Sequence, residues 1–295
     1  MTGFPPPGLP DLIVVGDLLA DVVVEAGTLV PGGDVHGRVN VRPAGSGANA
    51  AVWAADRGAR VRMFGRIGAE LIGRLLQDAL VERGVEPELI VDATVRTGAM
   101  LVVREAGERS MVADRGANAR LSPGDLPEVL AAGAVLVSGY LLFHPGSEGA
   151  AMAALERAEA PFVAVEAASW PLLEEYGPER FLAATKQATV LLANEREAEM
   201  LTGTTGVKAV EELAGSYETV VVKQGSRGAL AITRGETITA SAPEVTEADS
   251  TGAGDALDGV LLAELALGAQ LRGALQLACE AGARAASSLE TWPER

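Results

Sequence analysis

Residues 247–261 of the 295-residue chain, EADSTGAGDALDGVL, place a carboxylate, Asp255, directly after three small residues, Gly252, Ala253 and Gly254. An apolar helical pattern begins at the same point. Small residues let the backbone approach a ligand, and the N–H groups of a first helical turn can bind a phosphate. Asp255 would repel that phosphate unless it faces a second substrate and accepts a hydroxyl proton as the oxygen attacks phosphorus. The stretch therefore favours phosphoryl transfer to an alcohol, and a simple helix cap is the alternative.

The surrounding elements place this turn where α/β proteins bind ligands. Short apolar runs alternate with helical patterns, which predicts a mainly parallel sheet covered by helices. The expected strands are 11–16, 60–68, 134–140, 161–167, 189–194 and 219–225, and the expected helices are 47–59, 70–84, 148–160, 194–203, 253–268 and 270–286. Ligands bind beyond the carboxyl ends of such strands, where a turn leads into a helix.

Two segments, residues 17–44 and 95–114, instead alternate apolar and polar residues around glycine-containing turns. This pattern is typical of antiparallel hairpins. The two segments interrupt an α/β core made of residues 1–16, 45–94 and 115–295. We expect them to pair as a small β-sheet lid over the substrate site. Ordinary edge strands of the main sheet are the alternative.

Composition limits the partners. The formal net charge is −16, from 40 acidic and 24 basic residues, so nucleic acid and anionic membranes are not expected partners. The single cysteine, Cys279, forbids an internal disulfide and fits a reducing compartment. The sequence shows neither a signal-peptide pattern at its start nor a run of eighteen apolar residues. We expect a cytoplasmic globular protein.

Three further motifs accompany residues 249–255, which read DSTGAGD. Residues 44–70 form a glycine-rich segment, Asn194 and Glu197 form an Asn-x-x-Glu element, and residues 225–228 form Gly-x-x-Gly. In this order and spacing the four motifs resemble the ribokinase, or PfkB-type, carbohydrate kinase family, over nearly the whole chain. The resemblance implies a ribokinase-like three-layer α/β sandwich with a mainly parallel central sheet and a small β-sheet lid.

The resemblance also implies ATP-dependent transfer of the γ-phosphoryl group to a hydroxyl of a sugar or sugar-like substrate. Asp255 would be the catalytic base, and the N–H groups of Gly252, Ala253 and Gly254 would stabilise the transferring group. A nucleoside kinase of the same family, or a sugar-binding homologue without activity, is the alternative. The family's lids often serve as dimer interfaces, so a homodimer through the lid is a further expectation.

The family motifs assign a nucleotide site and a metal site. The expected ATP contacts are Asn194, Lys223, Gly225, Ser226, Gly228, Thr251, Gly254 and Cys279. Asn194 and Glu197 would hold Mg²⁺ through water, because oxygen-bearing side chains can order the waters of that ion. Alone, the Asn-x-x-Glu element reads as the cap of a surface helix. Lys223 could equally be a solvated charge, and Cys279 a packed helix residue.

The expected sugar contacts are Asp21, Gly45, Ser46 and Asn49, which match the family's acidic residue after the first strand and its glycine-rich loop. Asn49 could instead cap a helix, and Asp21 could be exposed in a hairpin. Leu19 and Ser46 stand where ribokinases proper use Asn and Lys, so ribose itself is not the expected substrate.

Arg115 stands where the second lid segment returns to the core, and Arg104 and Arg109 lie in that segment. A guanidinium that reached the pocket would suit an acidic or phosphorylated sugar. A surface pair of Arg115 with Asp114 or Glu105 is the alternative.

Asp249 and Thr251 match half of a potassium site in the family. Glu290 and Thr291 stand where a Gly-Ala turn would supply further carbonyls. A large monovalent ion needs several oxygens to offset its dehydration. We therefore expect weak or absent activation by potassium, unless Glu290 points inward and replaces those carbonyls.

Overall fold

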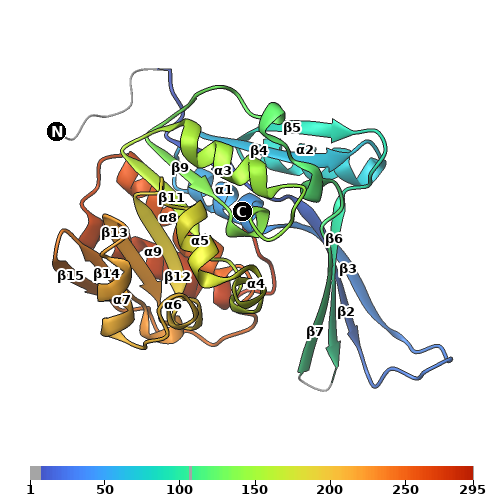
Figure 1. The fold of residues 1–295 in the computed structure, drawn as a ribbon. Coiled ribbons are helices and arrows are strands. Elements are labelled where there is room, and N and C mark those ends of the chain that lie inside the picture. Colours follow the sequence, from blue (N-terminus) through green and yellow to red (C-terminus); the bar gives the residue numbers. More distant parts are fainter. Residues whose placement is uncertain (1–7, 106–107, 295) are drawn as a thin grey trace.

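The computed structural model describes residues 8–105 and 108–294, without the side chains of residues 105, 108 and 109. Its centre is a nine-stranded sheet in the order β15-β14-β13-β12-β11-β9-β1-β4-β5 (Figure 1). All neighbours pair in parallel except β13 with β14 and β14 with β15. The strands are β1 Leu12–Val15, β4 Val61–Gly68, β5 Val85–Asp92, β9 Ala134–Val137, β11 Phe162–Glu166, β12 Val190–Asn194, β13 Thr219–Lys223, β14 Ala229–Thr233 and β15 Glu236–Ala240.

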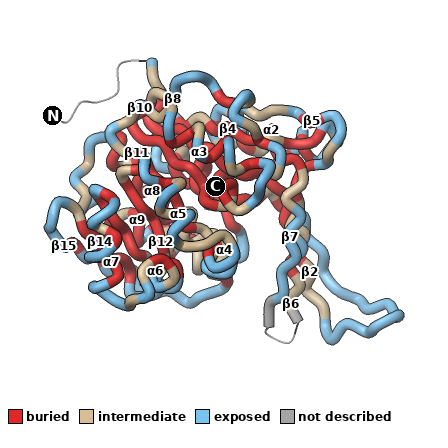
Figure 2. Tube along the Cα trace, in the orientation of Figure 1, coloured by how far each residue is buried: buried red, intermediate tan, exposed pale blue. Residues whose placement is uncertain are grey.

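Helices cover both faces of this sheet, because successive strand residues point to opposite sides. Val14 and Leu136 belong to one buried cluster, with α1 Ser46–Asp56, α2 Leu71–Glu82, α8 Ala253–Ala266 and α9 Leu271–Ala286. Val15 and Val137 belong to the other, with α3 Glu148–Arg157, α4 Trp170–Tyr176, α5 Pro178–Ala184, α6 Glu195–Thr202 and α7 Val207–Leu213. Figure 2 shows the buried strands between exposed helix faces. The expected three-layer sandwich is confirmed.

The two lid segments form a second sheet of their own, in the order β3-β2-β6-β7, which projects from the body (Figure 1). Its strands are β2 Leu19–Ala26, β3 Gly37–Ala44, β6 Gly98–Glu105 and β7 Glu108–Asp114. Each segment is an antiparallel hairpin, and β2 pairs with β6 in parallel. We call this the small sheet. It is separate from the main sheet, so the edge-strand alternative is wrong.

Several elements do not follow from the apolar pattern. β5 lies at the sheet edge, contains Pro87 and is only partly buried, so it lacks the run of apolar residues typical of inner strands. β14 and β15 form a hairpin across an Arg234-Gly235 turn at the other edge. The remaining short elements are β8 Leu130–Ala131, β10 Ala158–Glu159, η1 Gly116–Arg120, η2 Pro123–Asp125, η3 Gly139–Leu141 and η4 Gly225–Arg227. Within the described ranges, no helix has the length and apolar character needed to cross a bilayer.

Candidate active site

Polar side chains gather beyond the carboxyl ends of five neighbouring parallel strands. They are Asp17 after β1, Tyr140 after β9, Glu166 at the end of β11, Asn194 at the end of β12 and Lys223 at the end of β13. The N-terminus of α8, with residues 252–255, meets the same edge, because Lys223 approaches Gly254 and Asp258. This is the edge where a parallel sheet binds ligands.

The turn at residues 252–254, which we call the GAG turn, opens α8. Gly252 is the N-cap with φ +81°, a left-handed conformation that glycine adopts without strain, and its position has no side-chain cap. A Cβ atom added to Gly254 would lie 3.4 Å from the Lys223 Nζ. An uncapped helix start beside an ammonium group is a favourable place for an anion.

Asp255, in the first turn of α8, is held by two side chains of α1. Asn49 Nδ2 donates to Asp255 Oδ2 at 2.7 Å, and Ser46 Oγ lies 3.1 Å from Oδ1. Gly45, at the start of α1, has φ +112°, and a Cβ there would lie 2.5 Å from the Asp17 carbonyl oxygen. Only glycine therefore lets α1 begin so close to the segment after β1. Gly45, Ser46 and Asn49 were predicted as sugar contacts, and the structure places the last two against Asp255.

Glu166 extends this network. Ser46 Oγ lies 2.6 Å from Glu166 Oε2, but a hydroxyl has one proton and cannot donate to two carboxylates at once. Burial, together with the nearby charge of Asp255, raises the pKa of Glu166 well above its ordinary value. A protonated Glu166 can donate to Ser46, which leaves the Ser46 proton for Asp255.

Burial also raises the pKa of Asp255 to about 6, against the opposing effects of Asn49 and Lys223. Burial and the charges of Glu166 and Asp255 also raise the pKa of Tyr140. A carboxylate whose pKa lies near neutrality is suited to general-base catalysis.

Lys223 is surrounded by carboxylates. Its Nζ donates to Asp258 Oδ2 at 2.6 Å, and Asp258 Oδ1 is buried without a partner among the described residues. Burial lowers the pKa of Lys223, but the charges of Asp258, Glu166 and Glu197 outweigh this effect and raise it. Lys223, whose side chain is 13 % exposed, is therefore a largely enclosed, paired cation and not a solvated surface charge.

Asn194 and Glu197 form the cap of α6. Asn194 donates to the Glu197 carboxylate through its backbone N at 2.8 Å and through Nδ2 at 2.6 Å, and Glu197 N donates to Asn194 Oδ1 at 3.0 Å. This is a capping box, but Glu197 is buried and not on the surface. Burial raises the pKa of Glu197, so a divalent cation nearby would stabilise its ionised form.

The expected nucleotide loop follows β13. Gly225 has φ +60° and Gly228 has φ +98°, and a Cβ at Gly228 would lie 2.0 Å from the Ala240 carbonyl oxygen. Ser226 between them is exposed. Cys279 is 2 % exposed inside the core, with Sγ 3.8 Å from the same carbonyl, so the structure places it as a packed helix residue.

Asp21 and Arg115 both have protein partners. Asp21 Oδ2 lies 3.5 Å from Arg42 Nη2, and burial raises the pKa of Asp21 despite that partner. Arg115 Nη1 lies 3.2 Å from Asp17 Oδ2, and the guanidinium lies 5.0 Å from the centre of the Tyr140 ring.

The three arginines predicted near the pocket differ in their partners. Arg115 pairs with Asp17 in the site and not with Asp114, which instead accepts the backbone N–H of Gly116. Arg104 pairs with Asp249, and the side chain of Arg109 lies outside the described residues, as does that of Glu105.

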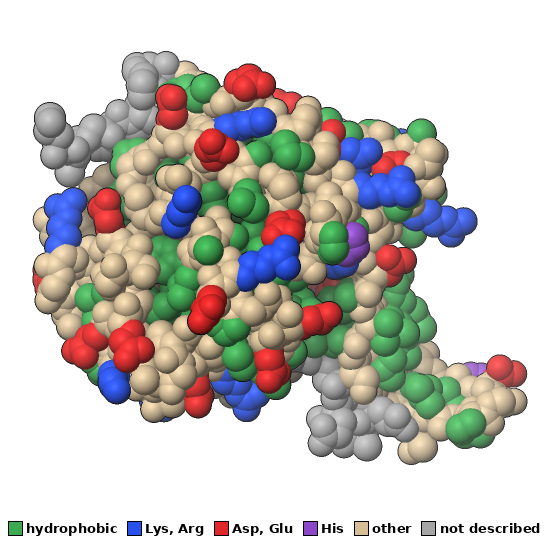
Figure 3. Space-filling model, viewed as in Figure 1, with side chains coloured by type: hydrophobic (Ala, Val, Ile, Leu, Met, Phe, Trp, Pro, Cys, Tyr) green, Lys and Arg blue, Asp and Glu red, His purple; other side chains and the backbone are tan. Residues whose placement is uncertain are grey.

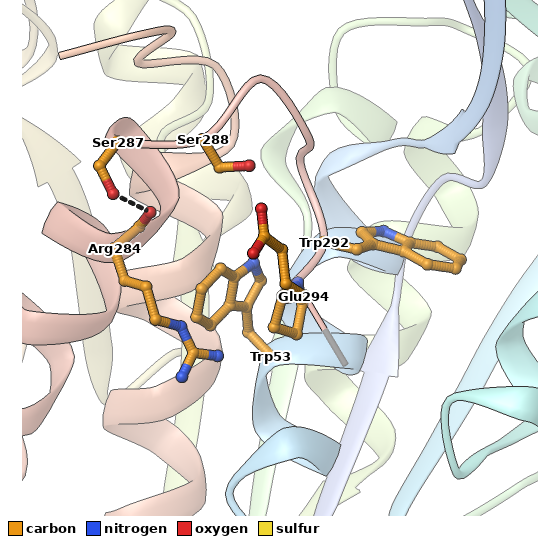
Figure 4. Close-up of a pocket in the computed structure, with 7 residues that line it drawn as sticks. Trp53, Arg284, Ser287, Ser288, Trp292 and Glu294 are labelled. Carbon is orange, nitrogen blue, oxygen red and sulfur yellow. Dashed lines mark hydrogen bonds between the residues drawn. The ribbon is translucent and has the colours of Figure 1, made fainter.

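A tryptophan in the C-terminal segment is linked to Asp255 through Asn49. Trp292 Nε1 donates to Asn49 Oδ1 at 2.9 Å, which fixes the amide so that its nitrogen points to Asp255. Trp53 Nε1 on α1 donates to the Thr291 carbonyl at 2.9 Å and holds the same segment. Behind it lies a cavity of about 290 Å³ lined by Trp53, Arg284, Ser287, Ser288, Trp292, Pro293 and Glu294 (Figure 4). None of these was predicted as a site residue.

The sequence motifs do not identify four of the residues described above, namely Glu166, Asp258, Arg42 and Trp292. Glu166 ends an apolar strand and Asp258 interrupts an apolar helix one turn after Asp255, so a carboxylate in an apolar run was an available signal. No such signal marks Trp292.

The model of the pfkB family of carbohydrate kinases matches residues 9–292. Ribokinase of Mus musculus is 27 % identical over 272 residues, 86 % of this chain and 81 % of the relative. A fructokinase of Klebsiella pneumoniae is 30 % identical over 264 residues, 84 % of this chain and 83 % of the relative. The crystal structure of adenosine kinase from Sinorhizobium meliloti shares the fold, with a TM-score of 0.87, 21 % identity and coverage of 97 % of this chain and 96 % of that one. The chain therefore belongs to the pfkB carbohydrate kinase family, whose members are phosphotransferases with an alcohol group as acceptor.

Proposed function

We propose that the protein transfers the γ-phosphoryl group of ATP to a hydroxyl of a sugar, with Asp255 as the general base. The observation that carries this proposal is the position of Asp255. It lies in the first turn of α8, whose start has no side-chain cap, and two donors of α1 fix its oxygens. An anion site beside an oriented base is what phosphoryl transfer to an alcohol requires.

The chain's own groups would divide the work. Asn49 and Ser46 orient Asp255, and the acceptor hydroxyl gives its proton to that carboxylate as its oxygen attacks phosphorus. The backbone N–H groups of the GAG turn stabilise the negative charge of the transferring group. Lys223 adds a fixed positive charge beside the turn. Gly225, Ser226 and Gly228 form the proposed nucleotide loop.

Mg²⁺ fits the acidic side of this site. The buried carboxylates around Lys223 have raised pKa values, and one oxygen of Asp258 has no partner among the described residues. No group of three or more metal-ligating side chains occurs in the described part of the chain, which favours binding through water. Asn194 and Glu197 would hold the hydrated ion, which supplies charge neutralisation on the phosphates.

The small sheet would act as the lid and would exclude water, which competes as an acceptor. Asp21 lies on its inner face and would bind sugar hydroxyls. Arg115 is already paired with Asp17, and this compensated charge favours a neutral acceptor over an acidic sugar.

We also infer a homodimer through the outer face of the small sheet. Val41, Val22, Leu101 and Val112 are neighbours across β3, β2, β6 and β7. Val41, Leu101 and Val112 are 57 %, 39 % and 66 % exposed. Figure 3 shows hydrophobic side chains gathered on this sheet. Contiguous exposed apolar surface of this kind marks interaction sites. The cytoplasmic location and the lack of nucleic-acid partners stay predictions.

An ADP-release assay over a panel of neutral sugars, acidic sugars and nucleosides tests the function, with ATP alone as the blank. We expect sugar-dependent ADP formation and a matching phosphorylated sugar by mass spectrometry. Turnover with nucleosides alone would indicate a nucleoside kinase. A rise in melting temperature with a sugar, but no ADP, would indicate a binding protein and contradict the proposal.

A further inference from the structure

Arg42 on β3 connects three parts of the chain. Its Nη2 lies 3.5 Å from Asp21 Oδ2 and 4.0 Å from Asp249 Oδ2, and its Nη1 donates to the Leu289 carbonyl oxygen. Arg42 is 6 % exposed. One buried guanidinium therefore links the small sheet, the loop before the GAG turn and the segment after α9.

Asp249 carries this link to the GAG turn. Its Oδ1 accepts the backbone N–H of Thr251 at 3.0 Å and the Thr251 hydroxyl at 2.7 Å. Its Oδ2 accepts from Arg104 on β6. The Ala286 carbonyl accepts the N–H groups of Ala248 at 2.8 Å and Asp249 at 3.2 Å, which joins the loop to the end of α9.

These contacts disagree with the potassium site that the family resemblance implies. That site would draw its oxygens from Asp249 and from carbonyls after Ser288. In the structure the Asp249 carboxylate and the Leu289 carbonyl both face the Arg42 guanidinium. A monovalent ion between them would meet like charge and would lack the oxygens that offset its dehydration. The residues present do not fit such an ion.

We propose that Arg42 is a built-in cation that takes the place of potassium in this protein. A guanidinium presents five N–H donors in a fixed plane, so it can join a carboxylate and a carbonyl at set angles. Its charge acts on Asp249 across 4.0 Å, beside Arg104, which donates to the same carboxylate oxygen, and so helps to position Thr251 and the GAG turn without a soluble ion. Arg42 is thus a positioning residue. Its catalytic consequence rests on the proposed kinase function, and its structural consequence does not.

The first experiment uses the native chain. Sodium is replaced by potassium at constant ionic strength and saturating Mg²⁺, and both kcat and the melting temperature without substrates are measured. We expect neither to change beyond error. Any stimulation of kcat beyond error, or a higher melting temperature in potassium, would overturn the proposal. The melting measurement needs no turnover, so it can succeed where the proposed function fails.

The second experiment removes the cation. Arg42→Ala should lower kcat by about tenfold, the scale of a lost charge-assisted hydrogen bond, and guanidinium sulfate, at a concentration that leaves the wild type unaffected, should restore part of it. Arg38→Ala is the matched control, because Arg38 lies on the same strand but is exposed. Unchanged kcat in Arg42→Ala, or no response to guanidinium, would overturn the proposal. The potassium experiment decides it even if Arg42→Ala does not fold.

Discussion

The basicity of Asp255 is set by a few side chains that come from distant parts of the chain. Burial disfavours its charged form, and donation from Asn49 and Ser46 favours it. Glu166 shares the Ser46 hydroxyl, and burial raises the pKa of Glu166 well above its ordinary value. The balance leaves Asp255 ionised at neutral pH but close enough to its pKa to accept a proton.

This balance predicts an acidic limb in the pH profile. We expect kcat/KM for the sugar to rise with pH up to an inflection near 6, because Asp255 must be ionised to act as the base. Stability should change in the opposite direction. A folded-state pKa raised above the ordinary 3.8 means that the stability contributed below that value is lost as the pH rises through about 6. A flat kcat/KM between pH 5 and 7 would contradict this assignment, and the melting temperature over about the same range checks the sign.

The link from Trp292 to the base gives a second prediction. Trp292→Phe removes the donor that fixes the Asn49 amide, and loss of one hydrogen bond, about 1 kcal/mol, should lower kcat about fivefold. The inflection of the acidic limb should also move to higher pH in this variant, because the hydrogen bond from Asn49 lowers the pKa of Asp255 and would be weakened. Trp170→Phe on α4, which lies at an exposed position, is the control. Equal kcat and equal limbs in both variants would exclude the link.

The sequence predicts those parts of the site whose residues are close together in the chain. Gly252, Gly254 and Asp255 are neighbours in the chain, so their chemistry is readable there. Ser46 and Glu166 are 120 residues apart, and Asn49 and Trp292 are 243 apart. Such pairs depend on how the strands and helices are arranged, and a single sequence does not show this.

Among the elements, the small sheet has two chemically distinct faces. Asp21 and Arg42 are paired on its inner face, and valines and a leucine form a row across its outer face. The alternation of apolar and polar residues predicts the two hairpins, but it does not predict that β2 pairs with β6. Paired residues such as Val24 and Val103 lie 79 residues apart, and only the main sheet brings the hairpins together. Likewise, the Asn-x-x-Glu element was readable as a cap, but its burial depends on β13 and α8.

The outer face predicts the oligomeric state. Val112→Asp places a charge at one end of the exposed apolar row, and we expect it to convert a dimer into a monomer in light-scattering measurements. Val207→Asp, at a 50 % exposed position of helix α7 on the main body, should stay dimeric. A monomeric wild type would remove the proposed interface.

As a whole molecule, the protein is an acidic chain for which we propose an anionic nucleotide as substrate. A net charge of −16 gives no general attraction, so in the proposed function binding would depend on local groups, namely the GAG turn, Lys223 and a hydrated Mg²⁺. Two arginines of the small sheet approach Asp249, namely Arg42 near its base and Arg104 near the outer end of β6. The loop before the GAG turn is therefore tied to both ends of the small sheet.

The central claim is that Asp255 takes the proton from a sugar hydroxyl, and the variant Asp255→Asn tests it most directly. Its side chain keeps the shape of the carboxylate but cannot accept the proton. The measurement is kcat together with the dissociation constants of ATP and of a sugar that the wild type phosphorylates. Asp78→Asn, an exposed position on α2, is the control. We predict a loss of kcat of about 10²-fold or more, with both dissociation constants nearly unchanged. Wild-type turnover in Asp255→Asn would contradict the account.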